Sequence, residues 1–210
     1  MSALRSAAFM FVISLVFTAL VSGVKLAHDA RIERNRSIKL QRIILKVLDV
    51  RIAPGTKDEG ILKLFARRVR KMDVNGRTVY IGYQDDGRTV LGYAFPVGGA
   101  GFWGPVQGMA AVDPGAGKLI GLAFYLHAET PGLGGRIVEP WFQDQFKGLP
   151  LRPVGGGRKF FHLKALAADR SKGELDAITG ATMTSRAVEA FLNLDLDRFL
   201  QQTFKSLKKD

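Results

Sequence analysis

The feature that most constrains this chain is an uncharged stretch close to its N-terminus. Residues 6–24 are rich in Phe, Val, Leu and Ala, with Arg5 before them and Lys25 after them. As a helix this stretch would be about 28 Å long, close to the roughly 30 Å hydrocarbon core of a bilayer. The sequence therefore predicts a single transmembrane helix. A cleavable signal peptide is the alternative, because Arg5 supplies a charged start and Ser22 and Gly23 are small, but the apolar run exceeds the usual length of about 7 to 15 residues.

Composition excludes several kinds of site. The chain has no cysteine, so disulfides, iron–sulfur clusters and zinc–thiolate sites are excluded. The three histidines, His28, His127 and His162, are far apart in the sequence, and we predict no metal site.

The net charge of +12 is concentrated in two basic clusters. The first directly follows the apolar stretch, where contact with lipid headgroups explains it more simply than nucleic acid. No nucleic-acid-binding module accompanies either cluster, so we predict no nucleic-acid partner. The clusters are Arg31, Arg34, Arg36, Lys39 and Arg42, and Arg67, Arg68, Arg70 and Lys71.

Turn motifs dominate the middle of the chain. Asn75-Gly76, Asp86-Gly87 and residues 113–117 separate runs rich in β-branched and aromatic residues, which is typical of an antiparallel meander. No G-x-G-x-x-G motif opens a helix after a strand, so a dinucleotide-binding Rossmann unit is not expected. The expected strands cover residues 78–83, 89–97, 106–112 and 119–126, with a further strand over 159–167 that returns to the sheet.

Amphipathic spacing predicts helices before and after these strands in the sequence. Apolar residues recur at helical intervals from Leu40 to Leu48, which indicates a helix over residues 31–50, ended by Pro54-Gly55. Shorter helices are expected to begin at residues 58–59 and 139–140, and a closing helix after residue 182. The expected fold class is α+β: one N-terminal transmembrane helix, then a largely antiparallel sheet flanked by helices.

Residues 176–185 directly precede the closing helix. They bring four hydroxyl side chains and two small residues, Gly180 and Ala181, to a helix start. Free backbone N–H groups and the positive end of the helix dipole favour a phosphate there. An ordinary capped helix is the alternative, with Thr182, Thr184 or Ser185 as the N-cap.

Two motifs resemble those of one family. Asp176-Ala177-Ile178-Thr179-Gly180-Ala181-Thr182 resembles the flavin-attachment motif of the FMN-binding subunits of bacterial respiratory ion pumps. These are the C subunit of the sodium-translocating NADH:quinone oxidoreductase and the G subunit of the Rnf complex. His127-Ala128-Glu129-Thr130-Pro131-Gly132-Leu133-Gly134 resembles the loop that this family carries against its flavin. A third string, residues 98–105, resembles the family around Trp103, which could otherwise be a core residue in a turn.

The resemblance covers roughly residues 95 to 192 and implies a covalent FMN, joined through its phosphate to Thr182 by a separate flavin transferase. It implies no catalytic residue and no soluble substrate. The chain would instead relay electrons among the other subunits of an ion-translocating membrane oxidoreductase. The implied cofactor-binding residues are Thr182, Asp176, Thr179, Gly180, Ala181, Thr184, His127, Glu129, Thr130, Gly132, Leu133, Gly134 and Trp103.

The expected organisation is an anchor over residues 1–27, a helical connector over 28–72 and an FMN-binding domain over 73–204. The resemblance places this domain on the periplasmic side of the inner membrane. Positive-inside reasoning places it in the cytoplasm, because basic residues follow the span. We expect the periplasmic side. The type of complex, sodium pump or Rnf, stays open, as do a stand-alone FMN carrier and a basic membrane-tethered scaffold without a flavin.

Overall fold

The computed structural model describes residues 2–154 and 157–208. The chain divides into two compact units, Met1–Leu40 and Gln41–Asp210. The first unit is helical throughout its described residues and belongs to the long helix α1, Ser2–Val47, whose last turns are part of the second unit.

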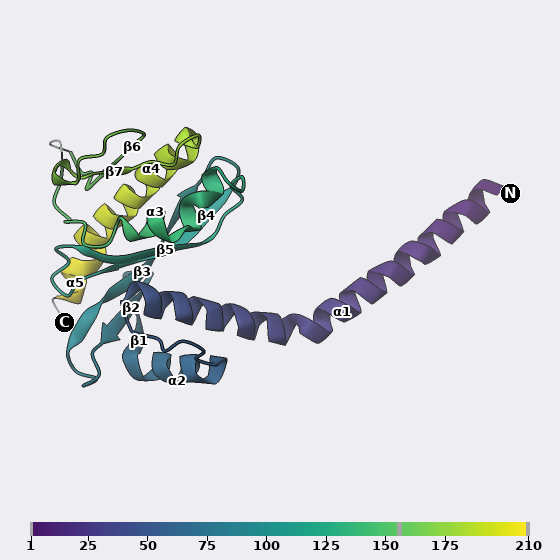
Figure 1. The fold of residues 1–210 in the computed structure, drawn as a ribbon. Helices are drawn as coiled ribbons and strands as arrows, with labels where there is room; N and C mark the ends of the chain where they lie inside the picture. The colour runs from purple at the N-terminus through teal and green to yellow at the C-terminus, as the bar shows by residue number, and fades with distance from the viewer. Residues whose placement is uncertain (1, 155–156, 209–210) are drawn as a thin grey trace. The chain divides into compact units, whose positions relative to one another are not determined.

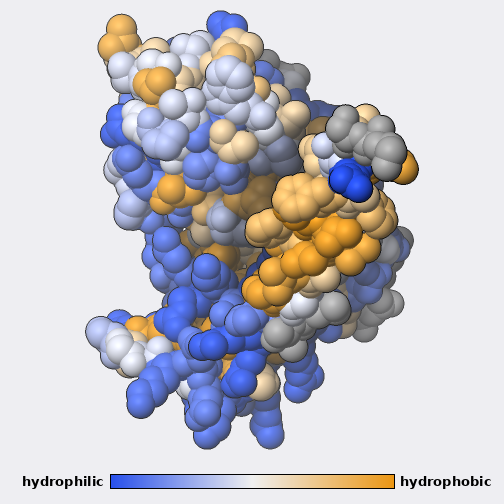
Figure 2. Space-filling model, turned by 90° about the vertical axis from the view of Figure 1, so that its right-hand side faces the viewer, coloured by the Kyte–Doolittle hydropathy of each residue, from blue (hydrophilic) through white to orange (hydrophobic). Residues whose placement is uncertain are grey.

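The N-terminal part of α1 is apolar and exposed. Its segment Ala3–Lys25 has 23 residues and a mean hydropathy of 2.3, and Figure 2 shows its hydrophobic side chains gathered in one group. Among the residues that the structure describes, this is the one helix long and apolar enough to cross a bilayer. The predicted helix is therefore confirmed, and its composition suits a membrane anchor.

Helix α1 ends before Pro54-Gly55, where the sequence pattern predicted the end of this helix. The backbone N–H of Val50 donates to the carbonyl of Leu45 at 2.9 Å, and that of Asp49 donates to Lys46 at 3.0 Å. Asp49 has a left-handed φ of 57°. These features form a Schellman motif, which closes a helix without a proline. The helix expected up to Val50 ends at Val47.

Five strands form one antiparallel meander in sequence order. The four strands predicted for this region are present, and the Asn75-Gly76 turn has the positive φ angles, 53° and 75°, of a type I′ hairpin. The first strand was not expected, because four of its six residues are exposed, as in an edge strand with charged side chains. The strands are β1 Val69–Val74, β2 Arg77–Tyr83, β3 Val90–Ala100, β4 Pro105–Val112 and β5 Leu119–Leu126.

Helices cover both faces of this sheet. On one face α4, Thr182–Arg198, packs over β3 (Figure 1). Just beyond the end of α4 the ring of Phe199 stacks on Phe95 with centroids 3.8 Å apart. On the other face the end of α1 approaches β5 so closely that a Cβ on Gly121 would lie 2.2 Å from the carbonyl oxygen of Val47. Each large apolar side chain buried between these layers contributes roughly 1.5–3 kcal/mol.

The strand expected over residues 159–167 does not return to the sheet. Only β6, His162–Lys164, is extended, and it pairs in parallel with β7, Glu174–Asp176, in a separate two-stranded sheet. Side chains of α4 hold this segment: the Oδ1 of Asn193 accepts the N–H of Phe160 at 2.6 Å, and Glu189 accepts that of Leu163 at 2.8 Å. These bonds take backbone donors that pairing with the main sheet would have used.

The remaining helical elements are short. The helix expected at residues 139–140 is confirmed as α3, with Pro140 in its first turn. Helix α4 continues directly into a π-helical turn. The elements are α2 Asp58–Arg68, η1 Gly134–Val138, α3 Pro140–Asp144, η2 Arg170–Lys172, η3 Phe199–Phe204 and α5 Lys205–Leu207.

Candidate functional site

A pocket of about 320 Å³ opens where three segments meet: the turn after β3, the loop after β5 and the start of α4. These segments are far apart in sequence, and the meander and α4 bring them together. All lining residues except Phe102 and Met183 are among those singled out by the sequence motifs. The pocket is lined by Phe102, Trp103, Glu129, Thr130, Leu133, Gly134, Gly180, Ala181, Thr182, Met183 and Thr184.

Glu129 joins the three segments. Its Oε1 accepts the backbone N–H groups of Phe102 at 2.8 Å and Trp103 at 3.0 Å, and its Oε2 accepts the hydroxyl of Thr184. The carboxylate is only 4% exposed, so these bonds are well shielded from water. Glu129 therefore fixes the pocket walls relative to one another.

Glycines make this arrangement possible. A Cβ on Gly134 would lie 2.4 Å from Oγ1 of Thr184 and 2.7 Å from Oε2 of Glu129, and one on Gly101 would lie 2.5 Å from Oε1 of Glu129. Such distances are too short for any side chain. The glycines that the sequence motifs contain thus leave room for the carboxylate.

The structure distinguishes among the four hydroxyl side chains of residues 176–185. Thr184 is buried and bonds to Glu129, and Ser185 is buried and accepts the N–H of Ile178 at 3.1 Å. Thr179 and Thr182 are exposed, and within the described parts of the chain neither hydroxyl has a hydrogen-bond partner. Of these two exposed threonines, Thr182 lines the pocket and Thr179 does not.

Helix α4 begins at Thr182 without a side-chain cap. Its N-cap residue is Ala181, which has no hydroxyl, so the alternative of Thr182, Thr184 or Ser185 as the N-cap is wrong. The first intrahelical donor is the N–H of Ser185, which bonds to the carbonyl of Ala181 at 3.0 Å. The N–H groups of the first helical turn therefore point, with the positive end of the dipole, toward the pocket edge that carries Thr182.

Large apolar side chains surround the pocket mouth. Trp103 is 66% exposed and Phe102 is 51% exposed, with their rings edge to face at 4.9 Å. Leu133 and Met183 are also about half exposed. Trp103 is therefore not a core residue. Exposed aromatic and aliphatic side chains around a concave site are typical of surfaces that bind a planar ligand or another protein.

The remaining residues that were predicted to bind the cofactor lie around the pocket and do not line it. The Nδ1 atom of His127 accepts the N–H of Glu129 at 3.2 Å, which shapes the loop, and Gly132 takes a positive φ of 73° in the same loop. Asp176 ends β7 with an exposed side chain. Phe102 and Met183, which the motifs did not single out, each adjoin a motif residue in sequence.

A neighbouring pocket of about 570 Å³ lies on the other side of Thr182. It is bounded by β6, the segment before α4 and the first turns of α4. Thr182 and Gly180 line both pockets. Its polar lining residues include Lys164, Thr179, Ser185 and Arg186.

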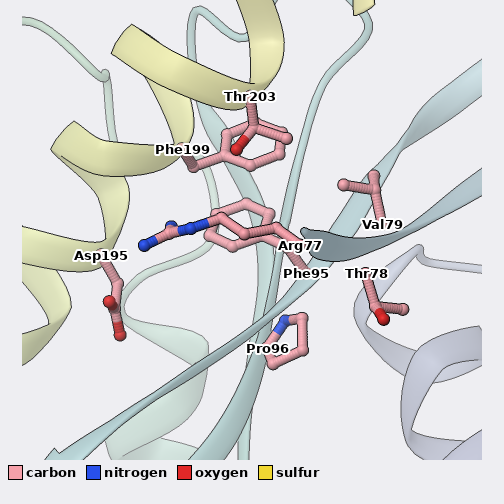
Figure 3. A pocket seen from close by; sticks show the side chains of 8 residues that line it. All are labelled: Arg77, Thr78, Val79, Phe95, Pro96, Asp195, Phe199 and Thr203. Atoms are coloured by element: carbon pink, nitrogen blue, oxygen red, sulfur yellow. The ribbon is translucent and has the colours of Figure 1, made fainter. Parts of the chain in front are cut away.

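A cavity of about 230 Å³ between β2, β3 and the end of α4 contains none of the motif residues (Figure 3). Arg77 extends across it toward Asp195, whose Oδ2 accepts the N–H of Gly98 at 2.9 Å. Burial raises the pKa of Asp195, although that bond and nearby arginines oppose the rise. The cavity wall is the stacked pair Phe95 and Phe199. We therefore assign these residues to the packing of α4 on β3.

No group of His, Asp and Glu side chains suited to a metal ion occurs among the described residues. The polar groups of the pocket are instead backbone N–H donors, hydroxyls and one buried carboxylate, both of whose oxygens already accept hydrogen bonds. Such a set suits an organic ligand with a phosphate.

The chain is similar in sequence to known proteins. Residues 101–196 match the FMN-binding domain family. The C subunit of the Na(+)-translocating NADH-quinone reductase of Neisseria meningitidis serogroup B is 35% identical over 112 residues, which cover 53% of this chain and 42% of that protein. The corresponding protein of Chlamydia muridarum is 29% identical over 182 residues, which cover 79% of this chain and 53% of that protein. The chain thus spans about half the length of the curated relatives it matches.

The fold also occurs in solved structures. The NqrC structure from Shewanella oneidensis matches with a TM-score of 0.71 and 24% identity, over 82% of this chain and 97% of that chain. The C subunit of the Na(+)-translocating NADH-quinone reductase from Parabacteroides distasonis matches with a TM-score of 0.65 and 22% identity, over 80% of this chain and 93% of that chain. The expected α+β architecture is confirmed.

Proposed function

We propose, from the match of residues 101–196 to the FMN-binding domain family, that this chain carries FMN covalently on Thr182 as an electron-relay subunit of a membrane oxidoreductase. The observation that carries the proposal is the position of Thr182. It is the one exposed, unbonded hydroxyl of the motif that lines the pocket of the described structure.

The pocket residues fit FMN in both of its parts. The exposed side chains of Phe102, Trp103, Leu133 and Met183 offer apolar surface to a flat ring system. The uncapped start of α4 offers backbone N–H groups to a phosphate. At about 320 Å³ the pocket is at the lower end of the usual range for small-molecule sites, which leaves part of the cofactor at the surface.

Thr182 has no base to activate it. In the described structure no histidine or carboxylate hydrogen-bonds to its hydroxyl, and an unassisted threonine hydroxyl is a poor nucleophile. We infer that a separate flavin transferase forms the phosphoester, with Thr182 as the acceptor. Asp176 and Thr179 lie exposed near it, where a transferase can contact them.

Bound FMN supplies electron transfer, and the protein positions it. Glu129 holds the turn of Trp103 and the start of α4 in a fixed relation, so the ring and the attachment point keep one geometry. The tether prevents loss of the cofactor by diffusion. The exposed side chains of Trp103 and Leu133 would hold the flavin ring at the pocket mouth, where its electron-transfer chemistry would be open to neighbouring subunits.

The relatives favour one type of complex. Those described above are C subunits of Na(+)-translocating NADH-quinone reductases, which favours the sodium-pump type over the Rnf type. The apolar helix Ala3–Lys25 would anchor the chain in the inner membrane beside the other subunits. A stand-alone membrane-anchored FMN carrier is the second candidate, and copurification of partner subunits distinguishes the two.

Intact mass tests the proposal. Coexpressed with a flavin transferase, the wild-type chain should gain the mass of FMN less water and fluoresce in a denaturing gel. Thr182→Val should lose both, because valine has nearly the same shape without the hydroxyl, and Thr182→Ser should retain flavin.

Both variants should still insert into the membrane and give the circular dichroism of the wild type. Flavin that remains on Thr182→Val would disprove the attachment site. A wild-type chain that gains no mass would leave only the scaffold interpretation.

A further inference from the structure

We propose that Arg186 is the counter-ion of the phosphate carried on Thr182, holding the tether on the side of the neighbouring pocket. This inference rests on the proposed function, and it assigns a positioning role to a residue that lies outside the attachment motif.

The helix places the two residues together. Thr182 and Arg186 are four residues apart at the start of α4, so their side chains share one face of the helix, one turn apart. Both line the same pocket of about 570 Å³ beside β6. A phosphate esterified to the Thr182 hydroxyl would therefore lie within reach of a long arginine side chain.

Arg186 is available for this contact. It is exposed, and within the described residues its guanidinium makes no ion pair or hydrogen bond. Lys164, the other cation of this pocket, is already paired with Glu174 at 2.6 Å. Arg186 is thus the cation of this pocket that can turn to a new anion without breaking an existing pair.

The chemistry of the adduct requires such a partner. A phosphoester that links FMN to threonine is a phosphodiester with one negative charge, and it has oxygens that accept hydrogen bonds. The N–H groups at the start of α4 can bond to some of these oxygens. The planar guanidinium can also bond to both non-bridging oxygens at once, which a lysine ammonium cannot do. Arg186 would thereby restrict the tether to one orientation.

The experiment compares flavin-loaded and unloaded protein in full-length chains purified in detergent. Loading of the wild type should raise the melting temperature. Arg186→Gln should reduce this increase by roughly 2 °C, the size expected for one partly exposed ion pair. The melting temperature of the unloaded protein should not change, because Arg186 makes no ion pair or hydrogen bond in the described part of the unloaded chain. The difference between the loaded forms should shrink in about 1 M salt, which screens exposed charges.

Two control variants make the result specific. Arg186→Lys should recover part of the increase, since it restores the charge but not the paired hydrogen bonds. Arg88→Gln removes the same charge in the turn between β2 and β3, and it should leave the increase unchanged. An increase equal to the wild type's in loaded Arg186→Gln would disprove the inference. A wild type that takes up no flavin would instead disprove the proposed function, so the two failures are distinguishable.

Discussion

The buried side chain of Glu129 holds the pocket walls together. It is 4% exposed and accepts two backbone N–H groups and one hydroxyl, from two segments that do not adjoin it in sequence. A buried carboxylate is costly unless such donors satisfy it. Here every contact is internal, so the residue that resembles a flavin ligand acts in the structure as the link between the pocket walls.

Substitution of Glu129 should separate the effect of its hydrogen bonds from that of its charge. Glu129→Ala leaves two N–H groups without an acceptor and should lower the free energy of unfolding by about 3 kcal/mol. Glu129→Gln keeps an acceptor for those N–H groups and an amide that can donate to Thr184, so it should cost about 1 kcal/mol. Urea unfolding at neutral pH gives both values.

The outcome for flavin loading follows from the same geometry. Glu129→Gln should still load, and Glu129→Ala should load poorly because the pocket walls separate. Equal losses of stability in the two variants would show that the charge, and not the hydrogen-bond geometry, is what the site requires.

At the scale of elements, sequence patterns located the segments that pair with their neighbours along the chain. The tight turns predict the hairpins because Asn75-Gly76 favours one backbone geometry regardless of distant contacts. The motifs likewise located most of the pocket, because they include Gly101 and Gly134, at which no side chain fits beside Glu129. They could not show which hydroxyl stays free, because that depends on Glu129 bonding to Thr184 more than fifty residues away.

The segment over residues 159–167 shows why the other strand prediction was wrong. Its residues have strand-like composition, but Asn193 and Glu189 of α4 take up its backbone donors. Those partners lie about thirty residues further along, so no local pattern reveals them. Similarly, β1 was missed because it is a charged edge strand whose only sheet partner is β2.

The stability that the contact between α4 and β3 contributes should depend on pH. Asp195 accepts the N–H of Gly98, and burial raises its pKa above the ordinary value of 3.8. The folded state therefore binds the proton more tightly than the unfolded state. The stability that Asp195 contributes is fully present below pH 3.8 and is lost as the pH rises through the raised folded-state pKa.

Asp195→Asn tests this dependence, since the asparagine carbonyl can still accept the N–H of Gly98 but cannot titrate. The stability of the variant relative to the wild type should increase as the pH rises from about 3.5 toward neutral, and it should then level off. Urea unfolding at a series of pH values measures the difference. A difference that is constant, or that decreases with rising pH, would contradict the assigned cause.

At the scale of the whole molecule, the charges around the span and the family resemblance predict opposite sides of the membrane for the sheet domain. One arginine precedes the span, and a cluster of basic residues follows it, which favours a cytoplasmic domain. The resemblance to the FMN-binding subunits implies the opposite, periplasmic side, where a covalent bond would keep the flavin from being lost by diffusion. We expect the domain to lie on the periplasmic side, because charge bias is one contribution among several to the orientation of a membrane helix.

The absence of native cysteine allows a direct test in intact cells, because a single introduced thiol is then the only one in the chain. Ser171→Cys replaces an exposed residue of η2 in the second unit, and Ala3→Cys lies at the N-terminal end of the apolar segment Ala3–Lys25. A maleimide that cannot cross the inner membrane should label Ser171→Cys at once and Ala3→Cys only after the membrane is permeabilised. The reverse pattern would place the flavin domain in the cytoplasm and show that the basic cluster after the span determines its orientation.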